Sequence, residues 1–205
     1  MTTEHTPTLE RIRSAAEAEF LKYGFRSASL RRIVRSVGMT TGAFYGYYKS
    51  KEELFAALVG EHYDYVLARF REAQEAFAAL PHERQPEELG EISGTCMFDM
   101  LRYAYAHLNA FKLILCCSEG TKFFGFIDEM VEIEVAATHA YQEVLQELGR
   151  PSPQIDPALE HILITGMFHT FFELVIHEMP LQNAENYVKE MRAFYTAGWM
   201  KIMGQ

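Results

Sequence analysis

The sequence has few cysteines, and those present are poorly arranged for disulfides. Cys96, Cys116 and Cys117 are odd in number and two are adjacent, which argues against a disulfide framework and for a reducing compartment. Long uncharged apolar runs are also missing, because no window approaches the roughly 18 residues of a membrane-spanning helix. Residues 1–8 are polar and lack the apolar core of an export signal. We therefore expect a cytoplasmic protein without a membrane partner.

Strand patterns and enzymatic motifs are missing as well. Beyond residue 54, no alternation of apolar and polar residues is bounded by turn pairs, whereas long helical periodicities recur between glycine and proline breakers. The chain is therefore predicted to be all-α. No nucleophile–base pair, Gly-rich phosphate loop or cofactor motif is evident, so we expect neither an enzyme nor a bound cofactor. The expected later helices span residues 50–80, 86–107, 111–117, 122–149, 157–178 and 182–203.

Positive charge is scarce over the whole chain, whose formal net charge is -9. Its distribution is uneven. Residues 1–60 contain nine Lys and Arg against six Asp and Glu, whereas the remaining residues contain ten against 22. A basic first part on an acidic remainder suits a protein of which only one end meets phosphates. With 205 residues, 49% of them hydrophobic, the chain can form a small first domain and a larger second domain.

A short helix followed by a turn is predicted after residue 29. Leu30, Ile33, Val34 and Val37 recur at helical spacing. Gly38 has no Cβ and so tolerates the left-handed turn that ends this helix.

A second and a third helix follow this turn. The hydroxyl of Thr40 can cap the second helix, which carries Phe44 and Tyr48 on one face. Ser50 and Glu53 form a capping box at the start of the third helix. In a helix-turn-helix, the first residues of the second helix enter the DNA major groove, so the pattern indicates DNA binding.

The ordered pattern over residues 9–59 resembles the N-terminal domain of the TetR/AcrR family of bacterial transcriptional regulators. Val34 and Val37 stand where alanine is usual in that family, Tyr47 where histidine is frequent and Tyr48 where phenylalanine dominates. These departures leave the operator sequence open. The residues that carry the resemblance are Ile12, Ala15, Ala16, Phe20, Tyr23-Gly24-Phe25, Ile33, Gly38-Met39-Thr40, Gly42 to Tyr48 and Lys51-Glu52-Glu53-Leu54.

The resemblance implies a DNA-binding domain over residues 1–54, with its helix-turn-helix at about 29–48, and a helical effector-binding and dimerisation domain over residues 55–205. It implies a ligand-responsive repressor that binds a palindromic double-stranded operator as a dimer. An activator, and a helical carrier or enzyme without DNA binding, are the alternatives. The residues expected at the DNA are Ser29, Arg31, Thr40, Thr41, Gly42, Tyr45, Tyr47, Lys49 and Lys51.

Among these, Tyr45 and Tyr47 are expected at phosphates or sugars rather than at base edges. For Arg31 and its neighbour Arg32, a solvated helix face explains the sequence as well as DNA contact does.

Two later helices, residues 158–177 and 187–203, are apolar around much of their circumference. Such helices must be buried, either in the core of the chain or between two chains. The resemblance favours a homodimer in which the two C-terminal helices of each chain form a four-helix bundle. A second chain related by a twofold axis would also bring a second DNA-binding domain to the other half-site of the operator.

Aromatic rings and methionines between residues 86 and 178 suit either an ordinary core or a pocket for an apolar effector. The resemblance implies a small-molecule effector, whose identity the sequence does not indicate. Glu134 and His169 lie beside apolar helical positions, where an unpaired polar group would cost a few kcal/mol. The candidate lining residues are Met97, Leu101, Tyr105, Phe111, Phe126, Met130, Glu134, Thr165, Phe168 and His169.

A metal site is geometrically conceivable at His169, Glu173 and His177, which are spaced four apart along one helix face. Such spacing is also that of ordinary surface pairs, so no metal is expected. Cys116 and Cys117 point apart on a helix and are not expected to sense redox state.

Overall fold

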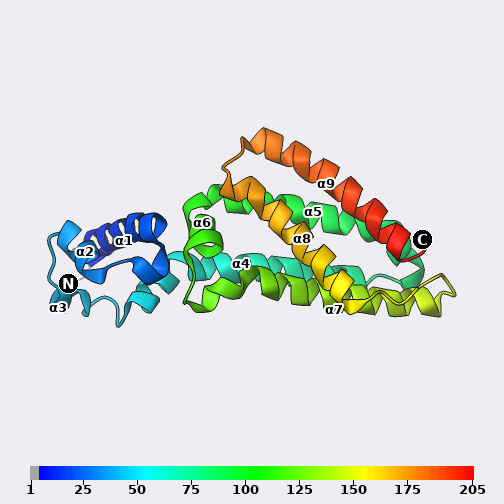
Figure 1. The fold of residues 1–205 in the computed structure, drawn as a ribbon, viewed down its shortest axis with the longest axis horizontal. Coiled ribbons are helices and arrows are strands. Elements are labelled where there is room, and N and C mark those ends of the chain that lie inside the picture. Colours follow the sequence, from blue (N-terminus) through cyan, green and yellow to red (C-terminus); the bar gives the residue numbers. More distant parts are fainter. Residues whose placement is uncertain (1–4) are drawn as a thin grey trace. The chain divides into compact units, whose positions relative to one another are not determined.

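The computed structural model describes residues 5–205, without the side chains of residues 5, 6 and 90–93. Residues 1–4, part of the segment considered above for an export signal, lie outside the described residues. Every regular element from residue 5 onward is a helix, so the predicted all-α class is confirmed (Figure 1). In chain order, the helices are α1 (His5–Ser27), α2 (Leu30–Ser36), α3 (Thr41–Phe44), α4 (Lys51–Ala78), η1 (His82–Arg84), α5 (Gln85–Ala106), α6 (Leu108–Cys117), η2 (Lys122–Gly125), α7 (Phe126–Glu147), α8 (Pro157–Ile176) and α9 (Leu181–Ile202).

The first of two compact units contains the described residues up to Asp64 together with His107–Phe126. Its core forms because apolar residues of α1 lie on one face of that helix. Ile12 and Phe20 are two turns apart and fully buried. Phe20 packs edge to face against Phe55 of α4, with 5.1 Å between the ring centroids.

Helix α6 and the segment after it pack against α1 in this unit. The Asn109 amide donates to the Glu17 carboxylate at 2.8 Å, and the Arg26 guanidinium lies 2.7 Å from the Glu119 carboxylate. Gly120 adopts a φ of 89° beneath Arg26, where a Cβ would lie 3.2 Å from the arginine Cγ. The first unit therefore extends beyond residue 54 and includes a segment from the middle of the chain.

The second compact unit contains Tyr65–Ala106 and Ile127–Gln205. It consists of the later part of α4 with α5, α7, α8 and α9. Leu145 is fully buried in a cluster with Phe77 and Tyr141, whose ring centroids are 5.5 Å apart. Of the aromatic residues predicted for a pocket, Tyr105 and Phe168 lie in this unit, whereas Phe111 and Phe126 belong to the first unit.

Helix α8 begins at a strong cap, because the Asp156 carboxylate accepts hydrogen bonds from two backbone amides of its first turn. By length and composition this helix is long and apolar enough to cross a membrane, with a mean hydropathy of 1.3 over its most apolar window. No such stretch was expected from the sequence. The difference arises because Glu160 and Glu173 interrupt the helix, which disqualifies it as an uncharged run, and 39% of the window is buried inside the unit.

Candidate nucleic-acid interface and candidate ligand cavity

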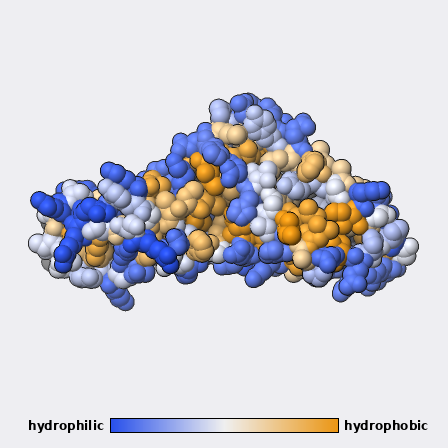
Figure 2. Space-filling model, viewed as in Figure 1, coloured by the Kyte–Doolittle hydropathy of each residue, from blue (hydrophilic) through white to orange (hydrophobic). Residues whose placement is uncertain are grey.

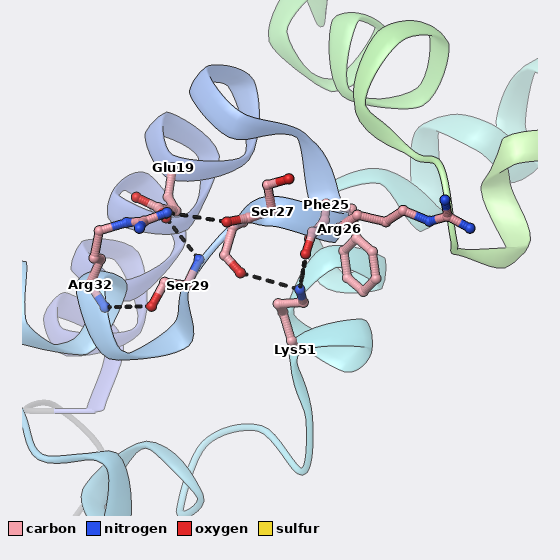
Figure 3. A network of polar contacts seen from close by, with 8 residues as sticks. Glu19, Phe25, Arg26, Ser27, Ser29, Arg32 and Lys51 are labelled. Atoms are coloured by element: carbon pink, nitrogen blue, oxygen red, sulfur yellow. Dashed lines mark hydrogen bonds and ion pairs between the residues drawn. The ribbon is translucent and has the colours of Figure 1, made fainter.

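The start of α2 is fixed by a polar network at its cap (Figure 3). The Ser29 hydroxyl accepts from the Arg32 amide at 3.4 Å, and the Ser29 amide donates to the Glu19 carboxylate at 2.8 Å. The Arg32 side chain also donates to Glu19 at 2.7 Å and lies over the Tyr23 ring. Burial alone would raise the pKa of Glu19, but the hydrogen bonds from Arg32 and Ser29 lower it overall. Ser29 and Arg32 thus position α2, while Arg31 is exposed.

The turn between α2 and α3 follows the predicted geometry. Gly38 has a φ of 73°, and the Thr40 hydroxyl accepts from the Ala43 amide at 3.1 Å. Phe44 and Tyr48 are buried and stacked, and Arg13 donates to the Tyr48 hydroxyl at 2.9 Å. The prediction that Phe44 and Tyr48 lie on the same, inner face of this segment is therefore confirmed.

Regular helix in α3 ends at Phe44, which corrects the predicted extent to about residue 48. The chain tightens there, because the Gly46 amide donates to the Ala43 carbonyl and the Tyr47 amide to the Phe44 carbonyl. Glycine has low helix propensity, which favours such an early end.

The predicted DNA-contacting residues of this segment differ in exposure. Gly42 and Tyr45 are exposed, whereas Thr41 and Tyr47 are half-buried. Tyr45 has an exposed fraction of 56%, which is unusual for a ring of its size.

The start of α4 forms the predicted capping box in a slightly different register. The Ser50 hydroxyl accepts from the Glu53 amide at 3.1 Å, while the Glu53 carboxylate accepts from the amide of Lys49 rather than of Ser50. The side chain of Lys49 is exposed.

Lys51 has a different role from the predicted phosphate contact. Its ammonium donates to the carbonyl oxygens of Phe25, Arg26 and Ala28 at 2.7, 3.4 and 3.2 Å, and it lies 4.3 Å from the centre of the Phe25 ring (Figure 3). All three ammonium donors therefore point at the end of α1. We correct the prediction, since this lysine ties α4 to α1.

A cavity of about 130 Å³ lies within the second unit, between α4, α5, α7, α8 and α9. Its wall is largely aromatic and thioether-bearing, and polar groups interrupt it at only a few points. The aromatic and thioether residues are Phe70, Phe77, Met97, Met100, Tyr141, Met167, Phe168, Phe171, Tyr195, Trp199 and Met203.

Glu134 is the carboxyl group of this cavity. Its Oε2 accepts from the Gln74 amide of α4 at 2.7 Å. Burial raises the pKa of Glu134 to about 7, against which the Gln74 hydrogen bond acts in the lowering direction. The thiol of Cys96 lines the same cavity, and burial raises its pKa to about 11, so it stays protonated at neutral pH.

Part of the first unit is similar to known regulatory proteins. Residues 12–58 match the profile of the bacterial regulatory proteins of the tetR family. The transcriptional regulator UidR of Escherichia coli K12 is 42% identical over 72 residues, which are 35% of this chain and 37% of UidR. The repressor NemR of the same organism is 29% identical over 119 residues, 58% of this chain and 49% of NemR. The chain thus spans less than half the length of these curated relatives.

This chain therefore resembles the tetR family over residues 12–58. Solved structures show a similar fold over nearly the whole chain. GusR of Salmonella enterica has a TM-score of 0.57 at 22% identity and covers 96% of this chain and 97% of its own. PfmR of Thermus thermophilus has a TM-score of 0.53 at 17% identity, covering 94% and 95% respectively.

Three of the ten predicted pocket residues line the cavity, namely Met97, Glu134 and Phe168. Leu101 and Met130 are fully buried in the packing between helices instead. Their helical spacing resembles that of lining residues, so only the rotation of each helix against its neighbours separates the two groups.

The other predicted lining residues have different surroundings. The Tyr105 hydroxyl lies 2.9 and 2.7 Å from the carbonyl oxygens of Leu174 and Met179 and can donate its one proton to either of them. Phe111 and Phe126 belong to the first unit, with 6.4 Å between their ring centroids. The remaining two also lie outside the lining: they are Thr165, which is half-buried, and His169, which is exposed.

Sequence reasoning missed the walls that α4 and α9 contribute. Gln74 of α4 and Arg192 and Trp199 of α9 line the cavity. Gly94 in α5 makes room for Arg192, because a Cβ at Gly94 would lie 2.1 Å from a guanidinium nitrogen. A glycine inside a helix that has no turn to make is a signal of such close approach.

The residues considered for a metal site and those considered for redox sensing lie in different parts of the chain. His177 and Glu173 form an exposed pair at 2.7 Å. No group of three metal-ligating side chains occurs among the residues that the structure describes. Cys117 is buried, which raises its pKa, while Cys116 is exposed.

Proposed function

We propose that this chain is a ligand-responsive transcriptional repressor that binds a palindromic operator as a homodimer. The observation that carries the proposal is the first unit, in which caps at Ser29, Thr40 and Ser50 hold a helix-turn-helix with exposed Gly42 and Tyr45. Exposed Lys49 supplies a positive charge close by in the chain. A DNA target implies a location in the cytoplasm. The similarity to NemR, a transcriptional repressor, supports the sign of regulation.

The proposed contacts divide into two kinds. Thr41 and Gly42 would face the groove, where hydroxyls bond base edges or phosphates and glycine allows close approach. Lys49, and Arg31 on the exposed side of α2, would meet phosphates. Tyr45 and Tyr47 would contact sugar or phosphate.

The proposed mechanism is a population shift. An effector in the cavity of the second unit would favour a spacing of the two heads that does not fit successive major grooves. Helix α4 contributes residues to both compact units, so a change in its path is a direct covalent route between cavity and head. The shift is limited by the difference in effector affinity between the two states.

The test is binding of the purified chain to the intergenic DNA beside its own gene, measured by fluorescence anisotropy over a range of salt concentrations. We expect sub-micromolar binding that weakens with salt. Thr41→Ala should relax preference among operator variants, whereas Lys49→Ala should weaken binding to all duplexes and lower the salt slope by about one. Binding to this DNA no tighter than to a random duplex would reject the proposal.

A further inference from the structure

The cavity of the second unit has an unusual charge distribution. Glu134 brings a carboxyl group into a wall made mainly of aromatic rings and thioethers. Its one hydrogen-bond partner among the described side chains is the uncharged Gln74 amide. A carboxylate in such a place is costly unless a positive charge compensates it.

Other titratable groups of the cavity wall do not supply that charge. Cys96 of α5 and Tyr141 of α7 are neutral at pH 7, since burial raises both pKa values. Tyr195 of α9 is a phenol, and α8 contributes only apolar side chains. Arg192 of α9 is the cation of the described wall, and its guanidinium lies against Gly94 of α5. No ion pair between Arg192 and Glu134 occurs among the residues that the structure describes, where Glu134 pairs with Gln74.

The aromatic rings around Glu134 also favour a positively charged ligand. Aromatic faces attract cations through their quadrupole, most strongly where water is excluded. The rings of Phe70 and Phe168 pack edge to face in the cavity wall, with 5.4 Å between their centroids. The centroids of Phe77 and Tyr141 are 5.5 Å apart. An adjoining hollow of about 470 Å³ shares Gln74, Phe77, Ala137 and Tyr141 with the cavity and gives further room for a ligand. Its wall combines apolar side chains with the ionisable side chains of Arg71, Glu75 and His82.

We propose that the cavity binds a hydrophobic organic cation, an ammonium-bearing molecule with an apolar body, whose positive charge pairs with the Glu134 carboxylate. The inference deepens the proposed function, since it assigns the effector class of the proposed regulator. Quaternary ammonium compounds are suitable probes, because their charge does not change with pH. Any pH dependence of their binding then reports on the protein.

The experiment uses the full chain and the fluorescence of Trp199, the single tryptophan, which lines the cavity. Benzyltrimethylammonium is compared with neopentylbenzene, its neutral isostere, and with 4-phenylbutanoate. From about pH 6 to about pH 8 the cation should gain about tenfold in affinity, as Glu134 with its pKa of about 7 becomes ionised. The neutral isostere should not gain.

Two variants complete the test. In Glu134→Gln the gain with pH should disappear and affinity for the cation at pH 8 should fall about tenfold. Glu132→Gln, on the same helix but exposed and outside the cavity wall, should behave as the unchanged chain. Cation binding that ignores both pH and Glu134→Gln would overturn the proposal. So would tighter binding of the carboxylate, or the absence of saturable binding for benzyl-, hexyl- and dodecyltrimethylammonium at millimolar concentration.

DNA binding measured on the same samples separates this inference from the proposed function. A chain that binds its intergenic DNA but no cation refutes the effector class alone. A chain that binds the cation but no DNA keeps the ligand assignment and refutes the regulator.

Discussion

At Glu134 the fold places an ionisable side chain where its neutral form is favoured. Gln74 supplies one hydrogen bond, which is less than a carboxylate obtains from water. Its folded-state pKa of about 7 lies above the ordinary value of 4.5, so the folded chain holds this proton more tightly than the unfolded chain does. Stability is therefore linked to pH at this one residue.

The linkage has a definite sign. Below about pH 4.5 both states are protonated and Glu134 has no effect, whereas between about pH 4.5 and pH 7 the unfolded state loses its proton first and stability falls. Above pH 7 the full cost, on the order of 3 kcal/mol, is present. Glu134→Gln should therefore stabilise the chain more at pH 8 than at pH 5 in urea unfolding. Glu132→Gln serves as the control, and an equal effect of Glu134→Gln at both pH values would contradict the argument.

Lys51 and Lys49 lie two residues apart and should act on different properties. Lys51→Met leaves three backbone carbonyls at the end of α1 without their charged donor, so we expect a loss of about 1–3 kcal/mol in unfolding free energy. Exposed Lys49→Met should leave stability within about 0.5 kcal/mol, and it should lower the salt slope of DNA binding by about one. Urea unfolding and salt-dependent anisotropy measure the two effects. A larger salt effect for Lys51 would restore its predicted phosphate contact.

At the scale of the elements, the turn between α2 and α3 depends on the left-handed backbone conformation of its glycine. Gly38 has a φ of 73° and nothing lies within 4 Å of its would-be Cβ, so Gly38→Ala acts through backbone strain alone, at about 1–2 kcal/mol. Gly42 has ordinary backbone geometry and a Cβ there would meet only Thr40 Oγ1 at 3.9 Å. Gly42→Ala should keep stability and weaken DNA binding if this residue approaches the groove. Thermal unfolding with DNA titration separates the two; equal loss of stability would contradict the comparison.

The elements also show which features were predictable from the sequence. Caps at Ser29, Thr40 and Ser50 depend on residues within four positions, so local pattern was sufficient for them. The pocket depends on how helices rotate against one another, and Leu101 has the same apolar character as the lining residue Met97. Periodicity does not resolve such rotations.

For helix α9 the sequence left open burial in the core or between two chains. In the structure, Trp199 lines the cavity while Phe194 is exposed. The two side chains lie five positions apart on one helix and serve different faces. The structural role of Lys51 was not predicted because its partners are backbone carbonyls about 25 residues earlier in the chain. Every residue has a backbone carbonyl, so the sequence does not indicate which of them will accept a hydrogen bond.

At the scale of the whole molecule, the second unit leaves apolar side chains uncovered on its last two helices. Ile162 of α8 is 64% exposed and Phe194 of α9 is 73% exposed, and Leu159 and Tyr187 are also exposed. Figure 2 shows apolar side chains gathered between the first half of α8 and the end of α9. Monomeric proteins rarely leave large contiguous apolar patches in water, so this face supports the proposed dimer through α8 and α9.

The proposed dimer can be tested with one charge. Phe194→Glu would bury two carboxylates at a twofold interface without compensating partners, so we expect the dimer dissociation constant to rise at least about a hundredfold in sedimentation equilibrium. Phe124→Glu is the matched control, because Phe124 is 66% exposed in the first unit and outside the proposed interface. Phe194→Glu should also weaken binding to the full operator more than binding to a single half-site. Only the full operator has two half-sites, so only there does linking two DNA-binding domains in a dimer increase affinity. A dimer that survives Phe194→Glu, or equal losses on both DNAs, would place the contact between chains elsewhere.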